Sequence, residues 1–546
     1  MRIAVAVPPI RDFYLTPHRL SALGARIVAE LCRKAGHEVR LFRFPSKERS
    51  HVLPLPPEAS YLEPYLVPAE LGPLSFFTRF QHFGPTFEEC SRQISVWRPE
   101  AVFISSFAYA YAEEAVELAR AVRRKIPGAR LVVGGAGPSS CPEYYFKQVT
   151  QNQDPHDPVA TARPCGSATQ KPLFDFVVVG EGEVTVPLLL EKLERLVQKR
   201  GPISDTEPQV IRADHLCREE EISVPVAIVK ETSEGIWVTT SLSRGCPKRC
   251  RFCSNHLCHG SEFRTAPLQA LEQALRRLPP KPILHLNFED DNLLSAPEYF
   301  FEVLEMVKIL HPYAQFSAEN GLDYLLLDPP TIDRLIQYGF RRFNLSLGTI
   351  YPETALQVDR PVDLSRYLEV IREIHNRGAS SITYFIAGLT GDAPERIVEQ
   401  IRFLQPLPTL IGISLFYPVP GIPGFTPPPS TLLDHPGLGR GSFAYPWTGA
   451  LTMEELVTAF RLCRYVNLLK KERKTAEEEA LVQRIQETKR LLTFAKRSGS
   501  HRAQCSRQKG PKNLEPEGLG ENMKETRWTM GEAPSNCSMV NLFFSH

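Results

Sequence analysis

Three closely spaced cysteines restrict the fold of this chain more than any other feature of its sequence. Cys246, Cys250 and Cys253 follow the pattern Cys-x3-Cys-x2-Cys and come directly after a strand-like run at 236–241. A short loop of this kind can place three thiolates on one small metal centre. An iron–sulfur cluster takes one cysteine per iron, so three ligands leave one iron of a four-iron cluster open. The pattern therefore predicts a metal centre with a free coordination position at the end of a strand.

Two other interpretations of the cysteines are a structural zinc site and three unrelated buried thiols. Structural zinc normally takes a second Cys or His pair about a dozen residues away. Cys258 and His259 lie near the motif, but they continue the same loop. The spacing, without a distant pair, favours an iron–sulfur cluster over zinc.

The motif of Cys246, Cys250 and Cys253, with aromatic Phe252 before the last cysteine, resembles the signature of the radical S-adenosylmethionine (SAM) enzymes. The resemblance implies a 4Fe-4S cluster whose open iron binds the amino and carboxylate groups of SAM. One electron from the reduced cluster then cleaves SAM to a 5′-deoxyadenosyl radical. The resemblance also implies an electron donor such as flavodoxin or ferredoxin and a small-molecule or peptide substrate.

The size and charge of the chain limit its class. A chain of 546 residues suits two or three domains rather than one core. Its 64 Lys and Arg residues nearly balance 62 Asp and Glu residues, so no overall charge favours nucleic acid or an anionic membrane. The run at 1–7 is followed by two prolines and predicts a buried strand rather than a signal peptide. No segment has the length of apolar sequence needed to span a bilayer, and a labile cluster requires a reducing compartment. We therefore expect a cytoplasmic protein that does not enter a membrane.

Strand-like and helical stretches alternate in two regions, which predicts an α/β fold. Apolar strand runs in the first region predict a doubly wound, Rossmann-like parallel sheet. About six strand–helix units between 236 and 419 predict a partial (β/α)6 barrel. Helical spacing further on predicts a C-terminal extension that either caps the barrel or is ordinary packing. The expected parts are a Rossmann-like domain at 1–200, a connecting segment at 201–234, a radical SAM domain at 235–426, a helical extension at 427–494 and a disordered tail at 495–546.

Loops at the carboxyl ends of strands are where a Rossmann-like sheet binds ligands. Two such loops carry serines and glycines, and a third reads Gly180-Glu-Gly-Glu183. Glycines alone are consistent with tight turns. However, the order of these loops and the cysteine motif resembles the cobalamin (B12)-binding radical SAM proteins. The resemblance implies that cobalamin contacts Ser105, Ser106, Gly134, Gly135 and Gly137.

The loop after the first strand, Pro8–His18, departs from the Asp-x-His-x-x-Gly pattern of many cobalamin domains. Asp12 and His18 are present but not at that spacing, so cobalt would lack this histidine ligand. We expect an enzyme that methylates or otherwise modifies an unactivated carbon, with cobalamin donating the methyl group. One alternative is a B12-independent radical SAM enzyme with a vestigial first domain. The other is a non-catalytic protein that binds zinc or an iron–sulfur cluster.

Further SAM contacts are implied by the same resemblance at the ends of later barrel strands. Glu289 and Asp290 correspond to the segment beside the SAM amino group, and a helix cap at Asn292 or Ser295 is the structural alternative. Ser346 matches a residue beside the ribose, although the acid common there is replaced by Gly-Thr. Gly388 belongs to the segment near the adenine.

Overall fold

The computed structural model describes residues 1–16, 21–66, 74–150, 171–199 and 208–497, together with Met539 and Phe543. Most of the segment expected to be a disordered tail lies outside these residues, and so does His18. No helix among the described residues combines the length and the apolar character needed to cross a membrane. The expected boundaries between domains stay predictions.

The first region forms a parallel sheet of six strands in the order β3-β1-β6-β7-β8-β9. The chain runs outward from β1 to β3 on one side and then continues from β6 on the other. This reversal of strand order creates the crevice in which such sheets bind ligands. The strands are β1 (Arg2–Val7), β3 (Glu38–Arg43), β6 (Ala101–Ser105), β7 (Arg130–Gly134), β8 (Phe176–Val179) and β9 (Gln209–Arg212).

Helices cover both faces of this sheet, which confirms the doubly wound fold. Along β1, Ala4 and Ala6 pack under α3 (Phe87–Val96) and α4 (Ala112–Lys125). The intervening Ile3, Val5 and Val7 pack against α2 (Leu23–Lys34) and α7 (Gly182–Lys199). Because both faces are buried, the strand is apolar from Ile3 to Val7 rather than alternating.

The second region is the expected partial barrel. Strands β11, β14 and β15 pair in parallel, as do β16, β17 and β18, and two parallel bridges link the two sets at Phe316–Phe340 and Leu322–Leu345. The strands are β11 (Gly235–Thr240), β14 (Ile283–Phe288), β15 (Gln315–Ser317), β16 (Arg342–Gly348), β17 (Ser380–Ala387) and β18 (Leu410–Leu415). The helices are α9 (Leu268–Leu275), α10 (Pro297–Leu310), α11 (Pro329–Tyr338), α12 (Pro352–Gln357), α13 (Leu364–Asn376) and α14 (Pro394–Leu404).

The segment expected to connect the domains contributes one strand to each. Strand β9 extends the first sheet, whereas β10 (Val226–Glu231) pairs antiparallel with β11. Other short elements are β2 (Ile10–Asp12), β4 (Ser50–Val52), β5 (Gln81–Phe83), α5 (Ala136–Ser140), α6 (Pro142–Phe146), α8 (His256–His259) and α15 (Ser430–Asp434).

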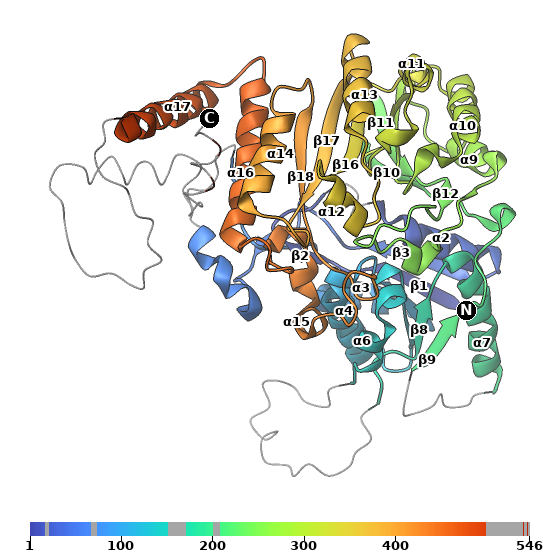
Figure 1. Cartoon of the computed structure of the whole chain (residues 1–546). Coiled ribbons are helices and arrows are strands. Elements are labelled where there is room, and N and C mark those ends of the chain that lie inside the picture. The colour runs from blue at the N-terminus through green and yellow to red at the C-terminus, as the bar shows by residue number, and fades with distance from the viewer. Residues whose placement is uncertain are drawn as a thin grey trace, which may run out of the picture.

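The C-terminal extension begins its long helix α16 (Met453–Lys470) at a capping box formed by Thr452 and Glu455. This helix lies along the edge strand β18, where Asn467 accepts from Ile411 N at 2.7 Å and donates to Ile411 O at 2.8 Å. It thus satisfies backbone groups that an open sheet edge exposes. The last described helix, α17 (Ala476–Arg497), follows it (Figure 1).

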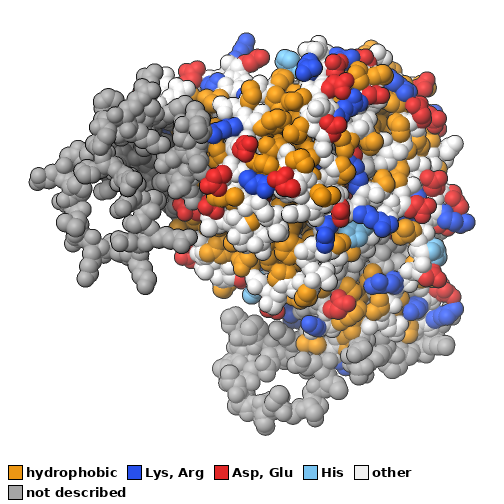
Figure 2. All heavy atoms as spheres, viewed as in Figure 1, with side chains coloured by type: hydrophobic (Ala, Val, Ile, Leu, Met, Phe, Trp, Pro, Cys, Tyr) orange, Lys and Arg blue, Asp and Glu red, His pale blue; other side chains and the backbone are white. Residues whose placement is uncertain are grey.

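Figure 1 shows the first sheet below the barrel strands, with the extension at the side of the barrel. On the face shown in Figure 2, acidic and basic side chains are interspersed with apolar ones, without a large area of one sign. Two regions of different fold therefore meet along a shared boundary, and the functional residues lie near it.

Candidate active site

The cysteine loop is closed at its base by a short two-stranded ribbon. Strand β12 (Ser243–Arg244) enters the loop, and β13 (Arg264–Thr265) leaves it, with Arg244 opposite Arg264. Gly245 turns the chain into the loop at a φ of +80°, where an added Cβ would lie 2.0 Å from the carbonyl oxygen of Glu262. Only glycine fits this turn, so the residue before Cys246 is fixed by the backbone.

Asp290 supports the start of the same loop. Its Oδ1 accepts from the backbone N–H groups of Leu242 and Ser243 at 2.8 and 2.6 Å, and from the Ser243 hydroxyl. Burial raises the pKa of Asp290 to about 6, although its hydrogen bond with Ser243 opposes the rise. The structure therefore places this predicted SAM contact beneath the loop, where it holds the backbone that leads to Cys246.

The neighbouring Glu289 points the other way. Its Oε2 lies 3.5 Å from the Ser21 hydroxyl, and the side chain lines a cavity against the first sheet. Neither Asn292 nor Ser295 caps α10, which follows Ala296 and has no side-chain cap. The helix-cap alternative for this segment is therefore wrong.

Two side-chain donors point at cysteine sulfurs. Asn292 Nδ2 lies 3.8 Å from Cys246 Sγ, and Arg360 Nη1 lies 3.8 Å from Cys250 Sγ. Arg360 also donates to the Ser346 carbonyl at 2.7 Å, which ties the loop to the end of β16. Donors of this kind stabilise ligand sulfurs and tune the reduction potential of a cluster. The sequence alone gave no indication of Arg360, because it lies 110 residues from its partner.

The donor set fits an iron–sulfur cluster. Burial raises the pKa of Cys253 to about 11, so this thiol needs a metal to become a thiolate at neutral pH. In the described part of the chain, no three His, Cys, Asp or Glu side chains are grouped as a single metal ion requires. A 4Fe-4S cluster places each cysteine on a different iron, so its ligand sulfurs need not converge on one point. Asn292 Oδ1 is buried beside the loop without a hydrogen-bond partner among the described residues and is free to meet a bound group.

The other predicted SAM contacts lie around the loop. Phe252 packs into an apolar cluster with Leu389, the residue after Gly388, and with Phe416. Gly388 follows β17 with a φ of +93°, and its N–H donates to Asp392 at 2.8 Å. The structure therefore brings the cysteine loop and the ends of β14, β16 and β17 together.

A cavity of about 360 Å³ lies at the carboxyl ends of β1, β6, β7 and β8. It is walled by α2 and α7 on the side of the first sheet and by Ser241, Arg244 and Glu289 on the side of the barrel. Three of the predicted cobalamin contacts line it, namely Ser105, Gly134 and Gly135.

The other two predicted cobalamin contacts lie behind the cavity wall. The Ser106 hydroxyl is 2.6 Å from the Tyr145 hydroxyl, and a Cβ on Gly137 would lie 2.4 Å from the same Tyr145 oxygen. Asp12 is engaged as well, because its Oδ2 accepts from the Tyr111 hydroxyl at 2.6 Å. Ser106 and Gly137 therefore shape the loop rather than face the cavity.

A match to the family model of the radical SAM superfamily covers residues 240–404, from the end of β11 to the end of α14. The chain therefore carries a radical SAM domain. The match includes the three cysteines, Glu289 and Gly388, and confirms the prediction of a radical SAM enzyme with a 4Fe-4S cluster and SAM as cofactors.

Two curated relatives are methylating enzymes by name. The hopanoid C-3 methylase of Methylococcus capsulatus is 23% identical over 417 residues, which cover 74% of this chain and 68% of the relative. The bacteriochlorophyllide d C-12(1)-methyltransferase of Chlorobaculum tepidum is 24% identical over 189 residues, or 34% of this chain and 41% of the relative.

A solved structure shares the fold of both regions. It is the radical SAM methyltransferase TsrM from Kitasatospora setae with cobalamin and a [4Fe-4S] cluster bound. The TM-score is 0.51 at 14% sequence identity, with 77% of this chain and 76% of that chain covered. The expected combination of a Rossmann-like sheet, a partial barrel and a helical extension is confirmed.

Proposed function

We propose that this protein is a cobalamin-dependent radical SAM methyltransferase that acts on an unactivated carbon. The observation that carries the proposal is the cavity at the switch point of the first sheet, which opens against the barrel at Glu289. A Rossmann-like sheet binds its ligand at this position. The names of the two methylating relatives and of TsrM support the same function.

The cluster, when bound, supplies the electron that cleaves SAM, and cobalamin supplies the methyl group. The chain's own residues hold these groups. Cys246, Cys250 and Cys253 would bind the cluster. Glu289 faces Ser21 and the cavity rather than the cysteine loop, so it would border the ligand of the cavity. The SAM contacts are assigned to Phe252, Ser346 and Gly388.

The cavity suits the nucleotide tail of cobalamin. Gly135 has a φ of +118°, and an added Cβ would lie 2.5 Å from the Ser106 carbonyl oxygen. The loop therefore stays flat against the sheet and leaves room above it. Because Asp12 is already bonded to Tyr111, it is not available to orient a histidine ligand for cobalt.

The cluster and cobalamin both require reduction. The reaction therefore needs an electron donor of the flavodoxin or ferredoxin class and a reducing compartment such as the cytoplasm. The substrate is a small molecule or a peptide.

The test is cobalamin retention by the anaerobically reconstituted protein after gel filtration, measured by absorbance. Gly135→Ala is the cavity variant. Its matched control is Gly36→Ala, which has a similar φ of +85° with no atom within 4 Å of an added Cβ. We expect wild type and Gly36→Ala to retain cobalamin and Gly135→Ala to lose it. A wild-type protein that retains its cluster but no cobalamin would support the B12-independent enzyme instead.

A further inference from the structure

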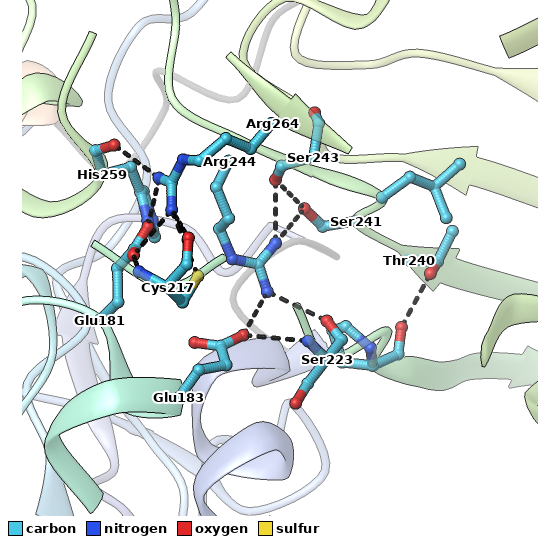
Figure 3. Close-up of polar contacts among 12 residues, drawn as sticks. Glu181, Glu183, Cys217, Ser223, Thr240, Ser241, Ser243, Arg244, His259 and Arg264 are labelled. Atoms are coloured by element: carbon cyan, nitrogen blue, oxygen red, sulfur yellow. Dashed lines mark hydrogen bonds and ion pairs between the residues drawn. The ribbon is translucent and has the colours of Figure 1, made fainter. Parts of the chain in front are cut away.

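A buried polar cluster joins the first sheet to the base of the cysteine loop (Figure 3). It starts from the segment Gly180-Glu181-Gly182-Glu183, which runs from the end of β8 into the first turn of α7 and whose two carboxylates reach across the boundary. Glu183 Oε1 accepts from Arg244 Nη2 at 3.0 Å. Glu181 accepts from Arg264 through both oxygens, at 2.7 and 3.1 Å. Each of these four side chains is at most 5% exposed.

The two arginines are neighbours on the ribbon that closes the loop. Arg244 lies directly opposite Arg264 in the β12–β13 pair. Like charges at this position in an antiparallel pair repel each other, more so when both are buried. One glutamate per arginine compensates the charges, so the ribbon depends on carboxylates that another region of the fold provides.

Further hydrogen bonds fix the direction of each carboxylate. Glu181 Oε2 accepts from the backbone N–H of Cys217 at 2.8 Å, and Oε1 accepts from His259 Nδ1 at 3.1 Å. Glu183 Oε1 accepts from the N–H of Ser223 at 3.2 Å. Both carboxylates are therefore held in single orientations, as positioning groups require.

The same segment, 180–183, also borders the cavity. Gly180, Glu181, Gly182 and Glu183 line it together with Arg244 and His259. One side of this segment thus contacts whatever fills the cavity, and the other side holds both strands that flank the cysteines. No other described ion pair reaches the β12–β13 ribbon from the first sheet.

We propose that Glu181 and Glu183 are positioning residues that fix the cysteine loop against the cavity of the first sheet. They set the place of the cluster relative to the ligand in that cavity. The identity of that ligand rests on the proposed function, whereas the fixing of the loop does not.

The first test uses the full-length apo protein under anaerobic, reducing conditions. Alkylation rates of Cys246, Cys250 and Cys253 are measured by mass spectrometry in wild type, Glu181→Gln and Glu183→Gln. Each variant removes a charge from a buried ion pair at nearly constant volume, so local opening of the loop becomes easier. We expect alkylation of the loop cysteines to accelerate about tenfold or more. Cys463, buried at 1% exposure in α16, reports global unfolding in the same samples.

The matched control is Glu114→Gln. Glu114 also forms a buried, two-oxygen ion pair, with Arg440 at 2.9 and 3.1 Å, and it also joins the first region to a distant segment. It has no bond to the cysteine loop among its described contacts. We expect this variant to lose comparable stability and to leave the loop cysteines at the wild-type rate relative to Cys463.

The second test uses the reconstituted protein and records the electron paramagnetic resonance spectrum of the reduced cluster with and without SAM. We expect Glu181→Gln to broaden the SAM-induced spectral change, whereas Glu114→Gln keeps the wild-type spectrum. Loop-cysteine rates that rise only in step with Cys463, or equally in Glu114→Gln, would overturn the proposal. If wild type fails to retain cobalamin while Glu181→Gln still accelerates alkylation of the loop cysteines, the positioning role stands and the proposed methyl transfer fails.

Discussion

Replacing Asp290 separates its role as a hydrogen-bond acceptor from its charge. In Asp290→Ala, the backbone N–H groups of Leu242 and Ser243 and the Ser243 hydroxyl lose their shared acceptor. Each buried donor left without a partner costs about 1–3 kcal/mol. The three unpaired donors should therefore cost the alanine variant about 3–9 kcal/mol of unfolding free energy, from which removal of the buried charge recovers up to about 3 kcal/mol at pH 7. Because these donors precede Cys246, it should also retain less iron after reconstitution.

Asp290→Asn should behave differently, because the amide oxygen still accepts while the buried charge is gone. The pKa of Asp290 rises from 3.8 to about 6, mainly through burial. A shift of about 2 pKa units corresponds to about 3 kcal/mol of destabilisation by the ionised form at pH 7. The asparagine variant should thus be as stable as wild type or up to about 3 kcal/mol more stable at that pH.

The pH dependence follows from the same shift. An acid with a raised pKa contributes most to stability below its unfolded pKa of 3.8, and this contribution is lost as the pH rises through about 6. Any stability lead of Asp290→Asn at pH 7 should therefore shrink between pH 6 and pH 4. Urea unfolding of the apo proteins at pH 4, 6 and 7 measures this difference in unfolding free energy. If Asp290→Asn and Asp290→Ala lose the same unfolding free energy at pH 7, the assigned acceptor role is refuted.

Three further predictions concern other contacts. Burial alone would lower the pKa of His259, but Cys258 and Glu181 raise it to about 10. In urea unfolding, wild type should therefore be more stable than His259→Gln by a full margin below pH 6.5, and this margin should vanish as the pH rises through 10. A margin that grows with pH contradicts this assignment. Arg360→Met should lower the reduction potential of the cluster in a redox titration, because a cationic donor to Cys250 is lost; an unchanged potential argues against this contact. Asn467→Ala should cost about 2 kcal/mol in urea unfolding, because two backbone groups of Ile411 lose their partners, and a neutral effect would exclude that role.

Much of the fold was predictable because burial leaves a periodic pattern. Strand β1 is apolar from Ile3 to Val7 since helices cover both of its faces, and the six barrel strands are spaced by helices of ordinary length. Strand β9 was harder to assign to the first sheet, because it is short and its Val210 is 42% exposed. A strand of this kind looks like any short segment between domains.

The cysteine loop was predictable because its spacing is local, whereas its supports are not. Arg244 meets Glu183 across 61 residues, and Arg264 meets Glu181 across 83. Asp290 was predicted as a SAM contact from its place after β14, yet its direction depends on how the end of β14 meets the turn after β11. Contacts of this type follow from the packing of elements and leave no periodicity in the sequence.

The most direct test of the central claim is SAM cleavage by the reconstituted protein. The protein is reduced anaerobically with SAM and cobalamin, and 5′-deoxyadenosine and S-adenosylhomocysteine are measured together, with Cys250→Ala as the background. We predict 5′-deoxyadenosine from wild type but not from the variant, and S-adenosylhomocysteine that depends on cobalamin. If neither product exceeds the background of the variant while the wild-type cluster is complete, radical SAM chemistry by this protein is contradicted.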